Sequence, residues 1–174
     1  MNIRGEKVLI PVRKFFLNSA VVHAYLRDRH CLVVHAYLGD RHCLVERLSG
    51  YLIADKLDIV SADIVAKKIT KRFEKLPKRK RMGIIYDNGT EFSAHEMIEK
   101  KTKAIVYFVN PYHSWERRTN ENTNGLLQQF FQKKSSFATV NQGDVDKTTK
   151  LLNRRPWKRL CYLTPKKMFH CASF

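Results

Sequence analysis

Short apolar runs alternate with turn residues in the first part of the chain. Apolar residues are concentrated at 31–38, 42–48 and 51–57, and the pairs Gly39-Asp40 and Ser49-Gly50 separate consecutive runs. Runs of this length, separated by glycine-containing turns, are typical of β-strands in hairpins. The pattern predicts three consecutive strands in an antiparallel meander.

After residue 60 the apolar spacing becomes helical. Ser61 is a candidate N-cap, Pro77 a stop, and between them the apolar positions recur at intervals of four, four and three: Val65, Ile69, Phe73 and Leu76. This spacing places one apolar stripe on an α-helix. We expect this helix to cross the sheet.

The following segment returns to short apolar runs. Residues 83–86 and 104–109 read as buried strands, and Ser93 with Glu96 has the spacing of a capping box for a short helix between them. The predicted order is strand, strand, strand, helix, strand, helix, strand (βββαβαβ). We therefore expect an α/β fold with a mixed sheet flanked by helices.

Helical patterns fill the last third of the chain. Residues 145–152 predict one helix and Thr164-Pro165 begins another, while an earlier helix has an apolar arc made of Leu126, Leu127, Phe130 and Phe131. On that earlier helix, Glu121 falls on the side of Asn124, Gly125 and Gln128, away from the arc, and is free to face a site.

A tandem duplication precedes the meander. Residues 22–33 recur as 34–45, and Arg27 against Gly39 is the only difference. Two short copies cannot form a solenoid, and an even number of inserted residues leaves each strand position on its original face. We divide the chain into an unassigned segment at 1–20, the duplicated segment at 21–45 and a core domain at 46–170.

Length and charge narrow the function. The 174 residues suit one domain, and 33 Lys and Arg against 16 Asp and Glu give a net charge of +17. Such a charge favours polyanionic partners, DNA first. No apolar run is long enough for a membrane span or a signal peptide, so we expect a cytoplasmic protein with no membrane partner.

Two basic groups are candidates for DNA contact. The first lies in and after the predicted helix and comprises Lys67, Lys68, Lys71, Arg72, Lys75, Lys78, Arg79, Lys80 and Arg81. The second, Arg154, Arg155, Lys158 and Arg159, surrounds Trp157. Phosphate contact is one interpretation and a solvated helix face is the other. Trp157 could stack on an unpaired base, although packing is the safer interpretation.

Two carboxylates stand where chemistry could occur. Asp87 follows the predicted strand 83–86, and Glu121 lies near the start of the helix that contains Leu126. Taken singly, each has an ordinary explanation, a turn aspartate and a solvated glutamate in a first helical turn. Together they suit two hard divalent cations, Mg²⁺ or Mn²⁺, and hence phosphoryl transfer.

Four longer motifs resemble a known family. VERLSGYLIADKL, IIYDNGTEF, VYFVNPYHSWERRTNENTNGLLQQFF and LLNRRPWKRLCYLTPKKMF occur between residues 45 and 169. This region is similar to the catalytic domain of DDE transposases of the insertion sequence thirty family. The resemblance implies a ribonuclease-H-like fold and metal-dependent cleavage and transfer of DNA strands. It makes Asp87 the second acid and Glu121 the third, with Glu116 as the nearest rival.

The family's first acid has no clear counterpart. It belongs to a Trp-Glu-Gly-Asp-like segment that this chain lacks; Asp28 is the closest carboxylate, and Asp40 falls in a predicted turn. The strand at 31–38 contains His35 and no acid. The family's upstream helix-turn-helix region is also missing, so we expect a truncated, partly decayed copy.

Three other interpretations stay open. One is an inactive DNA-binding remnant that interferes with a full-length relative, by occupying its DNA or joining its oligomer. Another is a basic RNA-binding protein. A zinc site in the duplicated segment would use His and Cys side chains, although copying one segment explains these residues more simply: His23, His30, Cys31, His35, His42 and Cys43.

Overall fold

The computed structural model describes residues 31–36, 41–57, 59, 61–81, 83–86, 93–108, 118–131 and 140–171. The strands are β1 (Cys31–Ala36), β2 (Arg41–Glu46), β3 (Leu52–Lys56), β4 (Gly83–Tyr86) and β5 (Ile105–Phe108). The α-helices are α2 (Ala62–Glu74), α3 (His95–Thr102), α4 (Arg118–Phe130), α5 (Gln142–Arg154) and α6 (Pro165–Cys171). The described residues also include two 3₁₀ turns, η1 (Lys78–Lys80) and η5 (Lys158–Leu160). The predicted mixed α/β fold is confirmed.

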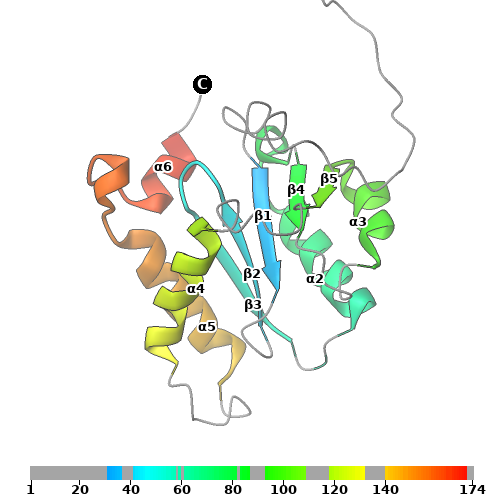
Figure 1. The fold of residues 1–174 in the computed structure, drawn as a ribbon, viewed down its shortest axis with the longest axis horizontal. Helices are drawn as coiled ribbons and strands as arrows, with labels where there is room; N and C mark the ends of the chain where they lie inside the picture. The colour runs from blue at the N-terminus through cyan, green and yellow to red at the C-terminus, as the bar shows by residue number, and fades with distance from the viewer. Residues whose placement is uncertain are drawn as a thin grey trace, which may run out of the picture.

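The strands form one mixed sheet in the order β3-β2-β1-β4-β5 (Figure 1). β1, β2 and β3 make the predicted antiparallel meander, while β4 and β5 run parallel to β1. β1 spans the junction of the two copies: Val33, the last residue of the first copy, is opposite its equivalent Val45, and the residues after Val33 pair within the second copy. The duplication therefore supplies both strands of the central hairpin.

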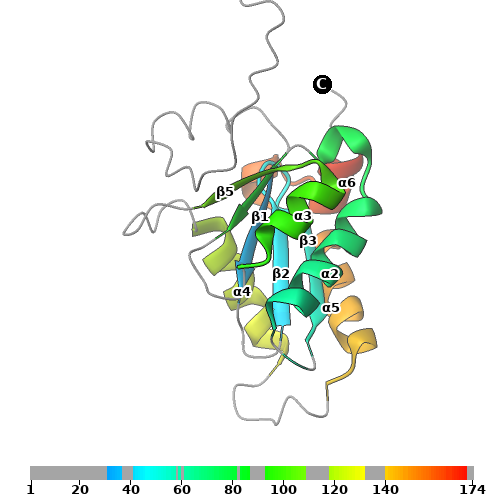
Figure 2. The same ribbon diagram turned by 90° about the vertical axis from the view of Figure 1, so that its right-hand side faces the viewer.

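Helices cover both faces of the sheet, as Figures 1 and 2 show. Adjacent residues of a strand point to opposite faces, so Leu44 packs against α2 and α3 while Cys43 and Val45 pack against α4 and α5. The α2 stripe predicted from the sequence is buried on the first face: Val65, Ile69, Phe73 and Leu76. The sheet thus separates α2 from α4.

The helix starts confirm some sequence signals and correct others. Ser61 caps α2 and Thr164 accepts a hydrogen bond at the start of α6, as predicted. The capping box predicted at Ser93 is wrong: α3 begins at His95, its N-cap is Ala94, and Ser93 is exposed one residue too early. Asn141 instead forms a capping box with Asp144 at the start of α5.

The predicted apolar arc of α4 is also wrong in part. Phe130 is 49% exposed, whereas Thr123 and Asn124 are buried with Leu127 and Phe131. Two adjacent apolar pairs, 126–127 and 130–131, span more of the helix circumference than one packed face can cover. The helix therefore buries positions 123, 127 and 131 against the sheet and turns Phe130 outward.

Candidate functional site

β4 ends at Tyr86, the residue directly before the second predicted acid, Asp87. β4 is buried along its whole length, and it pairs in parallel with β1 from Cys31 opposite Gly83 to Val33 opposite Ile85. Parallel neighbours end at the same edge of a sheet. Asp87 follows Tyr86 directly in the chain but lies outside the described residues.

The third predicted acid belongs to the first turn of α4. Glu121 is the fourth residue of this helix, which packs on the face of Cys43 and Val45. The described part of the chain includes its backbone and not its side chain. Asp28, Glu116 and Asp40 lie outside the described residues, and β1 has the sequence CLVVHA, which contains no carboxylate.

Asn124 is buried, although it lies on the side of α4 opposite the predicted apolar arc. The sequence places it with Glu121, away from that arc; it is only 8% exposed, and its Oδ1 atom has no hydrogen-bond partner among the described residues. It lies three residues after Glu121, on nearly the same side of the helix. An unpaired amide oxygen is the kind of ligand that Mg²⁺ and Mn²⁺ accept. No sequence signal distinguished it from a solvent-facing asparagine.

Four of the basic residues predicted to bind DNA bond within the protein. Lys68 donates to the Lys56 carbonyl, and the Arg81 guanidinium donates to the carbonyls of Leu76 and Glu74. These hydrogen bonds to backbone carbonyls hold the Lys68 and Arg81 side chains against the protein surface. Phosphate contact by these residues stays a prediction, and within the protein their side chains already have these partners.

Lys80 departs furthest from the prediction. It is 1% exposed, its Nζ atom donates to the Phe169 carbonyl, and the same atom lies 4.3 Å from the centroid of the Phe169 ring. A lysine this deeply buried joins α6 to η1. It cannot also reach a DNA backbone.

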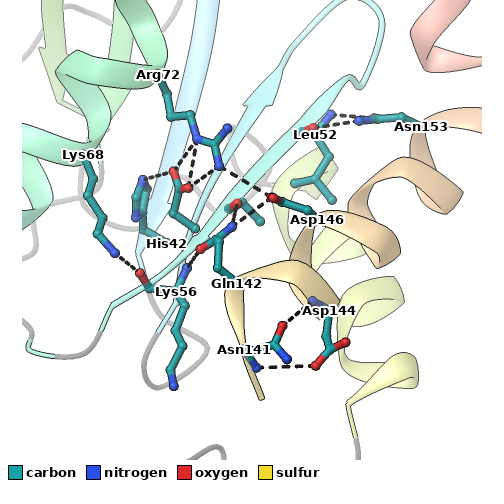
Figure 3. Close-up of polar contacts among 12 residues, drawn as sticks. His42, Leu52, Lys56, Lys68, Arg72, Asn141, Gln142, Asp144, Asp146 and Asn153 are labelled. Carbon is teal, nitrogen blue, oxygen red and sulfur yellow. Dashed lines mark hydrogen bonds and ion pairs between the residues drawn. The ribbon is translucent and has the colours of Figure 1, made fainter. Parts of the chain in front are cut away.

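Arg72, labelled in Figure 3, belongs to a polar network that includes Asp55 and Asp146. Its Nε atom lies 2.9 and 3.0 Å from the two carboxylate oxygens of Asp55, and its Nη2 atom is 3.5 Å from Asp146. The hydrogen bond to Asp55 is the main cause that raises the pKa of Arg72, and burial opposes it. This guanidinium is a structural group that connects α2 to β3 and α5.

His42 lies beside that network in the core. It is 1% exposed, and its Nε2 atom is 3.6 Å from an Asp55 oxygen, too far for a hydrogen bond. Burial is the largest cause that lowers the pKa of His42 from 6.5 to about 4; Asp55 opposes it, and Lys68 and Arg72 add to it. His42 is therefore neutral at pH 7.

The remaining predicted contacts divide between two surfaces. Lys67, Lys71 and Lys78 are exposed along and just after α2, and Arg154 and Arg155 are exposed at the end of α5. The side chain of Arg79 lies outside the described residues. Because the sheet separates α2 from α5, these two sets point from different faces of the domain.

An open groove of about 380 Å³ lies on the α5 side. Asn122 and Leu126 of α4 form one wall, and residues 155–159 form the other. Arg159 is fixed there, because its Nη1 atom donates to the Leu48 carbonyl and its guanidinium carbon lies 4.9 Å from the centroid of the Trp157 ring. Burial lowers the pKa of Arg159, and the nearby Glu46 opposes this.

No metal cluster occurs within the described residues. No three His, Cys, Asp or Glu side chains among them are close enough to share an ion. His42 and Cys43, from the zinc interpretation, belong to opposite faces of β2. The other members of that set lie outside the described side chains, as do the carboxylates of Asp87 and Glu121.

Comparison with known proteins gives the ancestry. No family model matches the chain. A transposase of insertion sequence IS4351 from Bacteroides fragilis is 49% identical over 86 residues, which are 49% of this chain and 26% of that protein. Transposase InsI of IS30A from Escherichia coli K12 is 38% identical over 124 residues, 71% of this chain and 32% of that protein. The chain is related to the IS30-family transposases.

Further comparisons extend this result. The transposase of IS1086 from Cupriavidus metallidurans is 34% identical over 121 residues. The fold also matches a chain from a complex of the simian T-cell lymphotropic virus intasome with PP2A regulatory subunit B56 gamma, with a TM-score of 0.68 over 82% of this chain and 54% of that one, at 15% identity. The chain spans about a third of the length of InsI and of the IS1086 transposase. No helix in the described ranges is both long and apolar enough to cross a membrane.

Proposed function

We propose that the chain is the catalytic region of an insertion-sequence transposase, with a ribonuclease-H-like fold, that acts on DNA in transposition and integration. The supporting observation is the sheet order β3-β2-β1-β4-β5, in which β1 and β4 are parallel neighbours. Asp87 directly follows β4 in the chain. In this proposal Asp87 and Glu121 are the catalytic carboxylates. The protein works in the cytoplasm, as a homo-oligomer or with a full-length transposase.

Asp87 and Glu121 would hold two Mg²⁺ or Mn²⁺ ions. Such ions, when bound, activate an attacking water or 3′ hydroxyl and stabilise the leaving oxygen of a phosphodiester. The chain's own contribution is position: buried β4 fixes the backbone that leads to Asp87, and α4 carries Glu121 over the same sheet. The amide of Asn124 lies on the buried side of that helix.

DNA binding in this proposal is carried by exposed basic side chains: Lys67, Lys71, Lys78, Arg154 and Arg155. Phosphate contacts make affinity fall steeply with salt and carry little sequence information. We expect non-specific binding whose affinity drops by at least about tenfold between ~50 and ~200 mM salt. An affinity that does not change with salt would contradict a phosphate-dominated mode.

A second candidate function is a DNA-binding remnant without catalysis. The observation that favours it is the sequence of β1, CLVVHA, which offers no carboxylate beside β4. A two-metal site that lacks one of its acids binds metal weakly and leaves the developing charge uncompensated. This protein would interfere with a full-length relative by occupying its DNA or joining its oligomer.

One experiment separates the two functions. Labelled DNA is incubated with the full chain and Mg²⁺ or Mn²⁺, and both DNA binding and strand cleavage or transfer are measured. Because of β1, we expect binding with absent or very weak cleavage. Robust cleavage that is lost in Asp87→Asn and in Glu121→Gln would establish the catalytic function, and its loss in Asp28→Asn would make Asp28 the first acid. Cleavage activity that survives Asp87→Asn would contradict the assignment of Asp87 as a catalytic carboxylate.

A further inference from the structure

The groove between α4 and residues 155–159 combines two kinds of surface. Its apolar part consists of Leu126, Pro156 and Trp157, and its basic part of Arg155, Lys158 and Arg159. A nucleotide has the complementary composition, an apolar base with two flat faces and an anionic phosphate. Aromatic side chains that stack on bases, beside a basic groove that follows the backbone, are the usual means of binding single-stranded nucleic acid.

The basic residues of the groove have different roles. Arg159 is already engaged with the Leu48 carbonyl and the Trp157 ring. Its guanidinium also lies against the backbone of Gly50, where a Cβ atom would come within 2.4 Å of an Arg159 nitrogen. Arg155 and Lys158 are exposed, and within the described part of the chain their side chains make no hydrogen bond or ion pair. These two charges are available to a ligand.

The size of the groove limits what can enter. Its volume of about 380 Å³ is at the small end of the ~300 to 1,000 Å³ range of ligand pockets. That space suits one nucleotide, whereas a paired duplex could touch only the rim. Asn122 in the wall follows Glu121 in the chain, so a strand in the groove would pass the first turn of α4.

We propose that this groove binds one unpaired nucleotide of a DNA strand, with its base on Leu126 and Trp157 and its phosphate on Arg155 and Lys158. The inference rests on the proposed function and deepens it. It assigns a strand-holding site next to the helix of Glu121. It also gives Trp157, half-buried at the groove, a role besides packing.

Tryptophan emission tests the site directly. The chain has two tryptophans, Trp115 and Trp157, so Trp115→Phe leaves Trp157 as the only reporter. The full chain carrying this change is titrated with a single-stranded DNA oligomer, its blunt duplex and an RNA of the same sequence, in EDTA so that no strand is cut. We expect saturable quenching of Trp157 by single-stranded DNA and much weaker quenching by the duplex.

Charge variants locate the binding. Arg155→Gln with Lys158→Gln should weaken binding of single-stranded DNA by about tenfold or more, because the phosphate contacts are lost. The matched control is Lys100→Gln with Lys101→Gln, which removes the same charge from exposed positions on α3. It should change affinity by no more than about threefold, through the general field of the protein.

Several outcomes would overturn the site. They are equal losses in the two double variants, an unchanged Trp157 emission at saturating single-stranded DNA, and tighter binding of the RNA. If the duplex still binds while these tests fail, the groove proposal falls and the proposed function stands. If neither form of DNA binds, the proposed function falls as well.

Discussion

The polar side chains of α5 and those of the segment just after it have opposite roles. Along the edge strand β3, side chains of α5 pair with the backbone: both Asn153 amide atoms bond Leu52 at 2.8 Å, and Gln142 bonds the Lys56 amide at 2.8 Å (Figure 3). Just after α5, Arg155 and Lys158 stay exposed at the groove. An edge strand whose backbone groups are hydrogen-bonded cannot pair with another strand. Charged side chains without a partner are available to a ligand.

This contrast separates folding from binding. Variants at the β3 edge should reduce the free energy of unfolding by removing partners from buried groups. Variants at the groove should change DNA affinity and leave stability nearly intact. Measuring both quantities for each variant tests the comparison.

The largest effect is expected for Asn153→Ala. This change leaves the buried N–H and C=O of Leu52 without their partners. At ~1 to 3 kcal/mol for each unsatisfied group, we expect a loss of about 3 kcal/mol in the free energy of unfolding, measured by urea denaturation. Lys150→Ala, on the exposed side of the same helix, is the control and should stay within about 0.5 kcal/mol. Equal losses in both variants would show that the stability of the fold does not depend on the hydrogen bonds between Asn153 and Leu52.

The next effect is expected for Arg72→Met. It leaves the Asp55 carboxylate, whose side chain is 9% exposed, without its bidentate partner. Breaking a buried pair costs about 3 to 5 kcal/mol, and because the Arg72 side chain is 31% exposed we expect about 2 to 3 kcal/mol. Lys71→Met removes the same charge from an exposed neighbour.

A second change sharpens the Arg72 result. Adding Asp55→Asn to Arg72→Met removes the uncompensated charge and should restore part of the stability. If the double variant is as unstable as the sum of the single ones, the carboxylate is not the source of the loss. Thermal or urea unfolding of the four proteins completes this cycle.

The pH dependence of stability reports on His42, which lies beside the Asp55–Arg72 pair. Burial lowers its pKa from 6.5 to about 4, so between these values the unfolded chain binds a proton that the folded chain does not. Stability is therefore full above pH 6.5 and falls as the pH falls toward 4, with a loss of about 2 kcal/mol by pH 5. Urea unfolding at pH 8 and pH 5 measures it. In His42→Gln the slope should be shallower by about one proton; an unchanged slope would assign it to other groups.

The smallest effect on folding is expected at the groove. Arg155→Gln with Lys158→Gln removes no bond from the described fold, so the free energy of unfolding should change by less than about 0.5 kcal/mol. The same variant should lose most of its affinity for single-stranded DNA. A large loss of stability instead would show that the groove residues stabilise the fold and would remove the difference between α5 and the segment after it.

Several parts of the candidate site followed from local patterns. The strand that leads to Asp87 is a short apolar run, and the helix of Glu121 has enough periodicity to be recognised. The roles of Lys80 and Arg72 did not follow, because their partners, Phe169 and Asp55, are distant in sequence or on another element. A basic residue looks alike in sequence whether it meets a carbonyl of the protein or a phosphate.

The sequence by itself determined the order of strands and helices, the starts of α2 and α6, and the excess of positive charge. These depend on residues within a few positions of one another, through side-chain periodicity and capping. Only the tertiary structure decided which charged side chains bond within the protein and which face of α4 is buried. It also decided that Trp157 lines a groove with Leu126. Burial and pairing depend on elements that meet after folding, and no local pattern of residues contains that information.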